Sequence, residues 1–404
     1  MAELLGMEKL KNKLAAKATG VSRRYRYYDM HIVLKEVNRD LPPEFAWMKS
    51  VLGWCGKAVD SLADRLVFRE FENDVFDMMQ IFQQNNMDII IDSAILAALI
   101  GSCSFVYIAA DEDDFPRLRI IDGMNATGVM DPVTYTLKEG YAVLERDENG
   151  NPIIEAYFTP GKTEYHEIGK EPYTINNVSR YPLLVPMIYR PDATRAFGHS
   201  RISRACMDLT QEAMRTLRRS DIASEFYSYP QRYVLGMSQD AEAFDKWKAA
   251  IAAFLRIDRD EDGNMPQVGQ FQQQSMTPYA DQIRMLAGLF AGETGLTLDD
   301  LGLPSQNPSS ADAIKASHET LRLMARKAQR TFGSGLLNVG FIAACIRDDY
   351  SYQRQQVYTT RASWEPIFEP DVAQLSGLGD AVNKIQQAFP DYFDENKLRN
   401  LTGI

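Results

Sequence analysis

One short motif resembles the end of a phosphate-binding loop. Gly161-Lys162-Thr163 matches the last residues of a P-loop, but the first glycine of that motif would fall at position 156, which is Ala156. The segment also lies between two expected strands, whereas phosphate binding requires a strand that leads into the N-terminus of a helix. We therefore interpret the segment as a hairpin turn that carries a lysine.

A run of carboxylates resembles the first half of an EF-hand loop. Asp258, Asp260, Asp262 and Gly263 have the required spacing, but the bidentate glutamate at the last position of the loop is replaced by Gly269. Without that ligand the affinity for calcium would be weak. The sequence favours a solvated turn over a metal site.

Side chains that catalyse reactions are present, but they do not form a catalytic pattern. The four histidines, His31, His166, His199 and His318, show neither an HExxH motif nor another metal-ligand spacing. The sequence has no GxSxG nucleophile elbow. We therefore expect no catalytic residue, no metal ion and no cofactor, and we predict that the protein is not an enzyme.

Composition and charge limit the function further. The 404 residues are 45% hydrophobic and 25% charged, which is typical of a globular protein with two or three modules. The formal charge of −11 argues against tight, sequence-independent DNA binding, because such binding needs a basic surface. The cysteines are few, far apart in sequence and typical of a reducing compartment: Cys55, Cys103, Cys206 and Cys345.

Two groups of basic residues stand out against this acidic background. Arg204, Arg215, Arg218 and Arg219 fall mostly on one side of an expected helix. A second group, spaced by three and four residues along another helix, consists of Lys315, His318, Arg322, Arg326 and Arg330. A solvated face, the acidic surface of a partner subunit and a nucleic-acid backbone are all compatible with this pattern.

The first hundred residues are predicted to form helices. Pro42-Pro43 can open one of them, because apolar residues then recur at helical spacing from Trp47 to Leu66. Two further helices are expected over residues 73–82 and 86–100.

Residues 93–110 carry no charge, but they do not have the pattern of a membrane span. Gly101-Ser102 interrupts the run, and its second half is rich in β-branched and aromatic residues. We predict a buried helix that leads into a buried strand. The N-terminus has lysines without an apolar core, so we also expect no secretory signal.

Residues 103–190 are predicted to form an antiparallel β module. Short β-rich runs alternate there with turn signals such as Pro160-Gly161. The expected strands cover residues 105–108, 117–121, 141–144, 153–158 and 182–189.

Helices are expected again after Gly198. Ser200 or Ser203 can cap a long helix that ends near Phe226. A small α/β piece follows, and then a helix over residues 278–292. In the α/β piece we expect strands at 231–235 and 267–271 and a helix at 241–257.

A loop over residues 295–308 combines apolar residues with glycine and proline. We expect part of its leucines, Leu296, Leu298, Leu301 and Leu303, to be packed against neighbouring helices. A third long helix should start at Ser309 and Asp312, which resemble a capping box, and end near residue 346.

Glycines at 333, 335 and 340 make a bend in that third helix plausible. The remaining sequence predicts a strand that ends at Trp364 and two short helices near residues 373–388 and 395–401.

In the order of these segments the sequence resembles the portal proteins of tailed bacteriophages, in the branch related to the portal of a Bacillus phage with a siphovirus tail. The matching segments are spread over most of the chain and keep their order. They are residues 54–66, Phe197-Gly198-His199-Ser200-Arg201-Ile202, residues 226–233, Asn307-Pro308-Ser309-Ser310-Ala311-Asp312-Ala313-Ile314, and Trp364 with Pro366.

The resemblance implies an α+β protomer with long stem and wing helices, a β-rich wing module, a small α/β clip and a short helical C-terminal crown. Its implied segments are an arm and wing (1–199), a first stem helix (200–226), a clip (227–275), a second stem helix (276–294), a tunnel loop (295–309), a wing helix and strand (310–369) and a crown (370–404). The tunnel-loop residues would be Leu296, Leu298, Asp299, Asp300, Leu301, Gly302, Leu303, Pro304, Ser305 and Gln306.

The resemblance also implies a role and partners. Portal proteins form a ring, usually of twelve copies, at one capsid vertex, through which DNA is packaged, the tail is joined and the genome is ejected. The implied partners are the terminase large subunit, the major capsid and scaffold proteins, a head-completion adaptor and double-stranded DNA that passes without sequence specificity. The implied location is the virion, and the host cytoplasm during assembly.

Two other classes remain open from the residues alone. A different ring-forming head–tail adaptor would also lack catalytic motifs. An intracellular hydrolase could use scattered carboxylates, but a ring of about twelve protomers would be unusual for such an enzyme.

Overall fold

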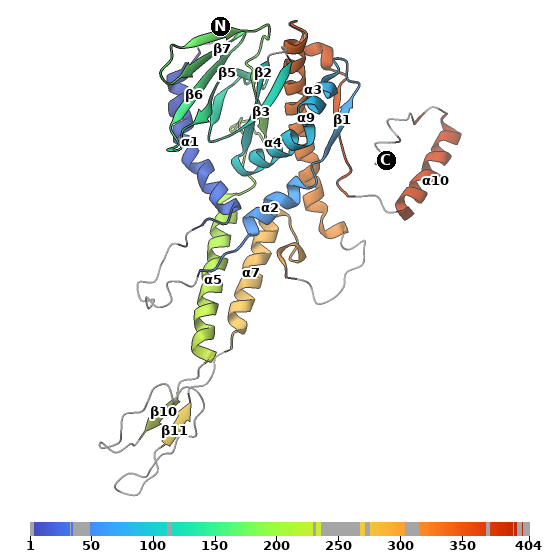
Figure 1. Ribbon diagram of the computed structural model, residues 1–404. Coiled ribbons are helices and arrows are strands. Elements are labelled where there is room, and N and C mark those ends of the chain that lie inside the picture. The colour runs from blue at the N-terminus through green and yellow to red at the C-terminus, as the bar shows by residue number, and fades with distance from the viewer. Residues whose placement is uncertain are drawn as a thin grey trace.

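The structure is a computed structural model. It describes residues 4–32, 34, 49–110, 115–228, 232–235, 267–270, 275–303, 315–368, 372–390, 392–393 and 398. A body of sheets and helices lies at one end, and two long helices, α5 (Arg204–Ser228) and α7 (Thr277–Thr294), project from it side by side (Figure 1). Strands β10 (Arg232–Leu235) and β11 (Gln267–Gln270) lie at the far end of these helices, and α10 (Val372–Ala388) stands clear of the body.

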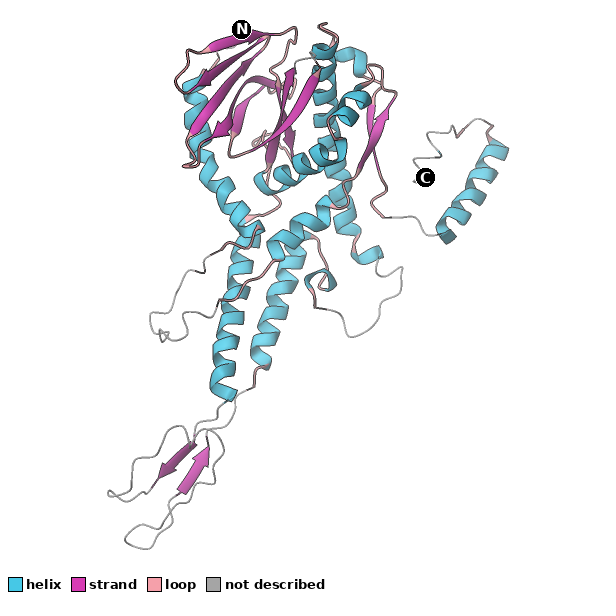
Figure 2. Ribbon diagram, viewed as in Figure 1, coloured by secondary structure: helices cyan, strands magenta, loops and turns pink. Residues whose placement is uncertain are grey.

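Along the sequence, helices precede and follow the β module, as predicted (Figure 2). The α-helices are α1 (Met7–Tyr28), α2 (Trp54–Ala63), α3 (Met78–Gln84), α4 (Met87–Gly101), α5 (Arg204–Ser228), α7 (Thr277–Thr294), α9 (Glu319–Arg347) and α10 (Val372–Ala388). Two short 3-10 helices are η2 (Asp299–Leu301) and η3 (Arg354–Val357).

The described strands form four antiparallel groups, ordered β3-β2-β9, β4-β5-β6-β7-β8, β1-β12 and β10-β11. Their bounds are β1 (Phe68–Glu72), β2 (Cys103–Ala110), β3 (Pro116–Asp122), β4 (Ala126–Met130), β5 (Leu137–Arg146), β6 (Pro152–Thr159), β7 (Lys162–Glu167), β8 (Tyr173–Asn176), β9 (Leu184–Ile188), β10 (Arg232–Leu235), β11 (Gln267–Gln270) and β12 (Arg361–Trp364).

The three-stranded sheet is buried between the five-stranded sheet and a layer of helices. Successive side chains of β2 point to opposite faces. On one face the Ser104 hydroxyl donates to the carbonyl oxygen of Ala94 in α4 at 2.6 Å. On the other face Tyr107 packs on Phe158 of β6 and its hydroxyl lies 2.7 Å from that of Tyr165. Burial on both faces explains why β2 is almost continuously apolar.

The predicted helix followed by a buried strand over residues 93–110 is confirmed by α4 and β2. Within the described residues, no helix is long and apolar enough to cross a membrane. All four cysteines are buried and unpaired.

Two N-terminal helices are shorter than predicted. The helix expected from Pro42-Pro43 to Leu66 begins only at Trp54, and residues 42–48 lie outside the described part of the chain. The residues just before α2 contact α5 instead, because the Ser50 hydroxyl donates a hydrogen bond to the Asp221 carboxylate at 3.2 Å. After Ala63 the chain turns into β1, which the sequence analysis missed.

The helix expected over residues 73–82 begins at Met78. Asn73 and Asp77 have positive φ values of 52° and 49°, which interrupt a helix. The Asp74 carboxylate accepts a hydrogen bond from the backbone N–H of Met79 at 2.8 Å and so satisfies a donor of the first turn.

All five predicted strands between residues 103 and 190 are present, but β4, β7 and β8 were missed. These three are only five, six and four residues long, and β8 is exposed along its whole length. The turn at Pro160-Gly161 joins β6 to β7, where Gly161 has φ of 78°. Lys162 therefore lies in a hairpin, as predicted, and not before a helix.

The helix α5 begins at Arg204 and is capped by Ser203, whose hydroxyl accepts the backbone N–H of Cys206 at 3.1 Å. Ser200, the other candidate cap, donates instead to the carbonyl oxygen of Ile100. The predicted strands at 231–235 and 267–271 are confirmed as the β10–β11 pair. The helix expected at 241–257 and the Asp258–Asp262 turn lie outside the described residues.

The helix α9 begins at Glu319, because a turn at His318 separates it from the helical residues 315–317. The capping residues expected at 309–312 lie outside the described part. Two of its glycines allow close packing: a Cβ on Gly335 would lie 2.6 Å from Met187 Sδ, and one on Gly340 would lie 2.8 Å from Met78 Sδ.

The strand predicted to end at Trp364 is confirmed as β12, and the helix near 373–388 as α10. The helix expected at 395–401 is not covered by the described residues, apart from residue 398.

Candidate functional site: the α7–α9 loop and the basic grooves

A buried arginine, Arg201, lies where α5 and α7 meet the body, next to the loop that follows α7. Arg201 is only 5% exposed and lies directly before α5. Its guanidinium donates to the carbonyl oxygen of Ala58 in α2 at 3.1 Å, to that of Thr294 at the end of α7, and to Met324 Sδ in α9 at 3.1 Å. Burial lowers the pKa of Arg201, because the charged form loses hydration. One side chain therefore joins α2, α7 and α9 at the base of α5.

The backbone around Arg201 is equally constrained. Gly198 has φ of 72°, and a Cβ at this position would lie 2.0 Å from the carbonyl oxygen of Tyr189. The N–H of Arg201 donates to the carbonyl oxygen of Leu99 at 2.8 Å. The sequence analysis singled out 197–202 as part of a resemblance but assigned no role to Arg201. Its only sequence signal was that matching segment.

The loop after α7 packs its leucines as predicted. Leu296 is buried, and Leu298, Leu301 and Leu303 are half-buried against the main core. Gly295 has φ of 68° and ends α7. Of the expected tunnel-loop residues, Pro304, Ser305 and Gln306 lie outside the described part of the chain.

Asp299 and Asp300 differ, although the sequence analysis treated them as a pair. The Asp300 carboxylate accepts the backbone N–H of Thr297 at 2.8 Å and its hydroxyl at 2.9 Å, and it lies 3.6 Å from His318 Nδ1. Asp299 is exposed. Asp300 therefore holds the loop, whereas Asp299 lies exposed at its surface.

The two predicted basic groups are partly neutralised. On α5, Arg204 lies 3.7 Å from Asp208, and Arg215 lies 2.5 Å from Glu212. Arg218 is half-buried and Arg219 is exposed.

On α9, Arg322 makes two hydrogen bonds of 2.7 Å to Glu319, which raise the pKa of Arg322. His318 belongs with the Asp300 loop, and Lys315 precedes the turn. Of the basic residues grouped over 315–330 in the sequence, only Arg326 and Arg330 line the grooves described next.

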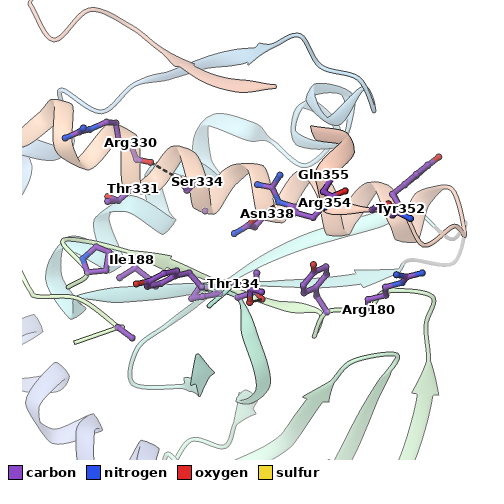
Figure 3. A pocket seen from close by; sticks show the side chains of 18 of the residues that line it. Thr134, Arg180, Ile188, Arg330, Thr331, Ser334, Asn338, Tyr352, Arg354 and Gln355 are labelled. Carbon is purple, nitrogen blue, oxygen red and sulfur yellow. Dashed lines mark hydrogen bonds between the residues drawn. The ribbon is translucent and has the colours of Figure 1, made fainter. Parts of the chain in front are cut away.

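The first groove has a volume of about 1140 Å³ and runs between α9 and the edge strand β9 (Figure 3). Its cations are Arg180, Lys327, Arg330 and Arg354, and its described lining contains no carboxylate. Arg354 Nε donates to Asn338 Oδ1 at 3.0 Å, and Arg180 Nε donates to the Ser351 hydroxyl at 3.1 Å. Burial lowers the pKa of Arg354.

A second groove, which we call the α9–β12 groove, has a volume of about 770 Å³ and shares Arg330 with the first. Its apolar lining includes Leu323, Leu337 and Trp364, and its cations include Arg326 and Arg361. Its described lining also has no carboxylate. Arg180, Lys327, Arg354 and Arg361 were not predicted, because a loop, the 3-10 helix η3 and the strand β12 bring three of them to α9 from distant parts of the sequence.

The described residues show no cluster typical of a metal site. No group of three or more histidine, cysteine or carboxylate side chains is placed to hold a metal ion in this part of the chain. His199 Nε2 lies 2.6 Å from Asp192, and that bond is the main cause of the lowered pKa of Asp192, but both side chains are exposed. The geometry is that of a hydrogen-bonded pair at the surface.

Comparison with known proteins defines the class as a phage portal protein. The chain belongs to the family described as phage portal protein, SPP1 Gp6-like, whose model matches residues 7–375. It is 26% identical over 341 residues to the portal protein of Mycobacterium phage L5, covering 76% of this chain and 67% of that protein. It is 25% identical over 338 residues to the portal protein of Mycobacterium phage D29, with the same coverage.

Chains of gene transfer agent particles show a weaker structural likeness. One, from the virion of a native particle, has a TM-score of 0.46 and 12% identity over 87% of this chain and 89% of its own. Another, from the neck of a native particle computed with C12 symmetry, has a TM-score of 0.40 and 14% identity over 87% and 91%. The family assignment therefore rests on the sequence match. The resemblance found in the sequence is confirmed, and the adaptor and hydrolase alternatives are not favoured.

Proposed function

We propose that this portal protein forms a ring of twelve copies around a channel at one capsid vertex, through which DNA is packaged and later ejected. The observation that carries the ring is an exposed apolar face on α7. Met285 and Leu289 are 57% and 55% exposed, one helical turn apart. Gly288 and Gly292 share this face, and a Cβ on either would meet no atom within 4 Å.

Such a face suits a close contact with a helix of the next subunit. Glycines spaced by four residues allow two helices to approach closely, and the exposed apolar side chains gain free energy on burial. A head-to-tail contact of this kind either closes into a ring or grows into a filament. A ring of α5–α7 pairs would place the channel along these helices.

We assign the described elements to the segments that the resemblance implies. In this proposal α5 and α7 are the stem helices, β10 and β11 belong to the clip, and α10 belongs to the crown. The body, with α9 and β12, is the wing. The segment 295–309 is the tunnel loop.

The proposed role is structural and not enzymatic. The motor that hydrolyses ATP would be the terminase large subunit, docked at the clip, and a head-completion adaptor would later take its place. The capsid and scaffold proteins would hold the body during assembly in the host cytoplasm. An acidic channel repels DNA phosphates, so the duplex slides and is not held.

The ring is tested with Leu289→Asp. A carboxylate in the proposed contact should prevent ring closure but leave the protomer folded, because Leu289 is exposed in the single chain. Mass photometry and negative-stain top views measure the ring, and circular dichroism measures the fold. Ile168→Asp, at a residue that is 70% exposed in the body, is the matched control. A normal ring from Leu289→Asp would contradict the proposed contact.

A further inference from the structure

An apolar stripe on α10 is only partly covered in the single chain. Leu375, Leu378, Val382, Ile385 and Phe389 are spaced by three and four residues, so they share one side of the helix. Val382 is buried and the two leucines are half-buried, but Ile385 is 38% exposed and Phe389 is 66% exposed. α10 also stands clear of the body (Figure 1). The stripe therefore has surface left to bury.

The α9–β12 groove is an uncovered surface of matching length. Leu323, at one end of it, is 54% exposed, and Leu337 lies fourteen residues further along α9. The stripe from Leu375 to Phe389 also spans fourteen residues. At a rise of about 1.5 Å per residue, each surface is about 21 Å long.

The charges of the two surfaces give a direction. Arg326 lies in the half of the groove nearer Leu323, Arg330 lies midway between Leu323 and Leu337, and Arg361 adds a third cation to the lining. The C-terminus of a helix carries partial negative charge. Three carboxylates follow α10 closely in the sequence, Asp391, Asp394 and Glu395, and two precede it, Glu369 and Asp371. The helix dipole and the larger number of carboxylates therefore favour placing the C-terminal end of α10 at the Arg326 end of the groove.

We propose that α10 of one subunit docks, antiparallel, into the α9–β12 groove of a neighbouring subunit. Phe389 then lies near Leu323, and Leu375 lies near Leu337. Seven residues join α10 to Trp364, which lines the α9–β12 groove of the same chain. In the single chain, however, α10 does not occupy that groove. A neighbour is within reach, because seven extended residues span about 25 Å. The proposal rests on the ring assembly proposed above.

A disulfide between subunits tests the contact directly. Leu323→Cys and Phe389→Cys are placed on separate, differently tagged chains, which are co-expressed and oxidised. We expect a covalent dimer that carries both tags on non-reducing gels. The background should be low, because the four native cysteines are buried. Leu323→Cys with Leu375→Cys is the matched control, since antiparallel docking keeps these positions about 21 Å apart.

The outcomes separate the alternatives. No mixed dimer, or a disulfide only when both cysteines share one chain, would overturn docking between subunits. A link from 323 to 375 in place of 389 would overturn the antiparallel direction. Mass photometry of the same variants under reducing conditions measures ring formation separately. A ring without the link refutes this contact alone, whereas the absence of any ring contradicts the proposed function.

Discussion

The guanidinium of Arg201 donates a hydrogen bond to the carbonyl oxygen of Thr294, the last residue of α7. Carbonyl groups at the end of a helix have no partner within the helix, so a buried helix end needs an outside donor. Arg201 lies three residues before α5, and the 295–303 loop starts directly after Thr294. The position of that loop is therefore fixed by the same cation that joins α5 and α7 to the body.

Arg201→Ala should destabilise the protomer strongly. The substitution leaves the buried carbonyl oxygen of Thr294 without a donor, at about 1–3 kcal/mol. It also removes the hydrogen bond to the carbonyl oxygen of Ala58, which keeps its partner within α2, and it creates a cavity. Arg201→Lys should recover only part of the loss, because a single ammonium lacks the planar fork that reaches three acceptors. The measurement is the free energy of unfolding in urea.

The control for this prediction is Arg204→Ala. The Arg204 side chain is 92% exposed, and removing it should change stability by no more than about 0.5 kcal/mol. Equal stability of the Arg201→Ala and Arg204→Ala variants would show that the buried cation does not hold the helices.

Gly198→Ala should be one of the most damaging small substitutions in the chain. An added Cβ would lie 2.0 Å from the carbonyl oxygen of Tyr189, and φ of 72° already disfavours a side chain. Gly150→Ala is the matched control, because Gly150 has φ of 84° but no atom within 4 Å of the added Cβ. The control should cost about 1 kcal/mol from the backbone alone. A similar shift in melting temperature for both variants would contradict the clash.

Elements with local signals could be predicted from the sequence. The apolar run of α4, the Ser203 cap of α5 and the strand of β12 each depend on residues close in sequence. The strand β1 could not be predicted in the same way, because its partner β12 lies almost 300 residues away. A short, partly polar strand is stabilised by that pairing and not by its own propensity.

The site was less predictable for the same reason. Asp299 and Asp300 are identical neighbours in the sequence, and only the turn formed with Thr297 makes one a structural acceptor. The basic residues of α9 were grouped by helical spacing alone. Arg322 is hydrogen-bonded to Glu319 and does not line the grooves, whereas Arg354, from a separate segment, lines the first groove beside α9.

Acid should weaken the docking of α1 on the five-stranded sheet. The Glu155 carboxylate accepts hydrogen bonds from Lys11 Nζ at 2.8 Å and from the Tyr141 hydroxyl. Burial alone raises the pKa of Glu155, but these two partners outweigh it, and the pKa lies below its usual value. Because the folded pKa is lowered, the stabilisation is present above the unfolded pKa of about 4.3 and is lost as the pH falls through the folded value.

Glu155→Gln should therefore flatten the acid limb of the stability profile, by about 1 kcal/mol or less at a partly exposed pair. Urea unfolding at several values between pH 3 and pH 7, with hydrogen exchange of α1, measures the effect. Glu171→Gln, at an exposed position after β7, is the control and should follow the wild type. If the acid limb of Glu155→Gln matched that of the wild type, protonation of Glu155 would not be the cause of the loss of stability at low pH.

The channel itself is tested most cleanly at Asp299. A double substitution of Asp299 and Asp300 would also disrupt the turn, because Asp300 accepts both hydrogen bonds from Thr297. Asp299→Lys keeps the Asp300 carboxylate that accepts both of these hydrogen bonds. In a twelve-fold ring it would place twelve ammonium groups at one level of the channel, and each phosphate contact strengthens DNA binding through the release of counterions.

We expect Asp299→Lys to assemble normally but to slow or stall DNA translocation, with the deficit shrinking as salt rises from about 50 to 200 mM, because screening weakens the new contacts. The measurement is packaging in vitro, scored by DNA protected from nuclease over time. Asp299→Asn removes the charge without adding attraction and should package close to the wild-type rate. Glu171→Lys applies the same kind of charge reversal outside the loop and should have no effect. Normal packaging by Asp299→Lys at both salt concentrations would mean that the 295–303 loop does not face the DNA.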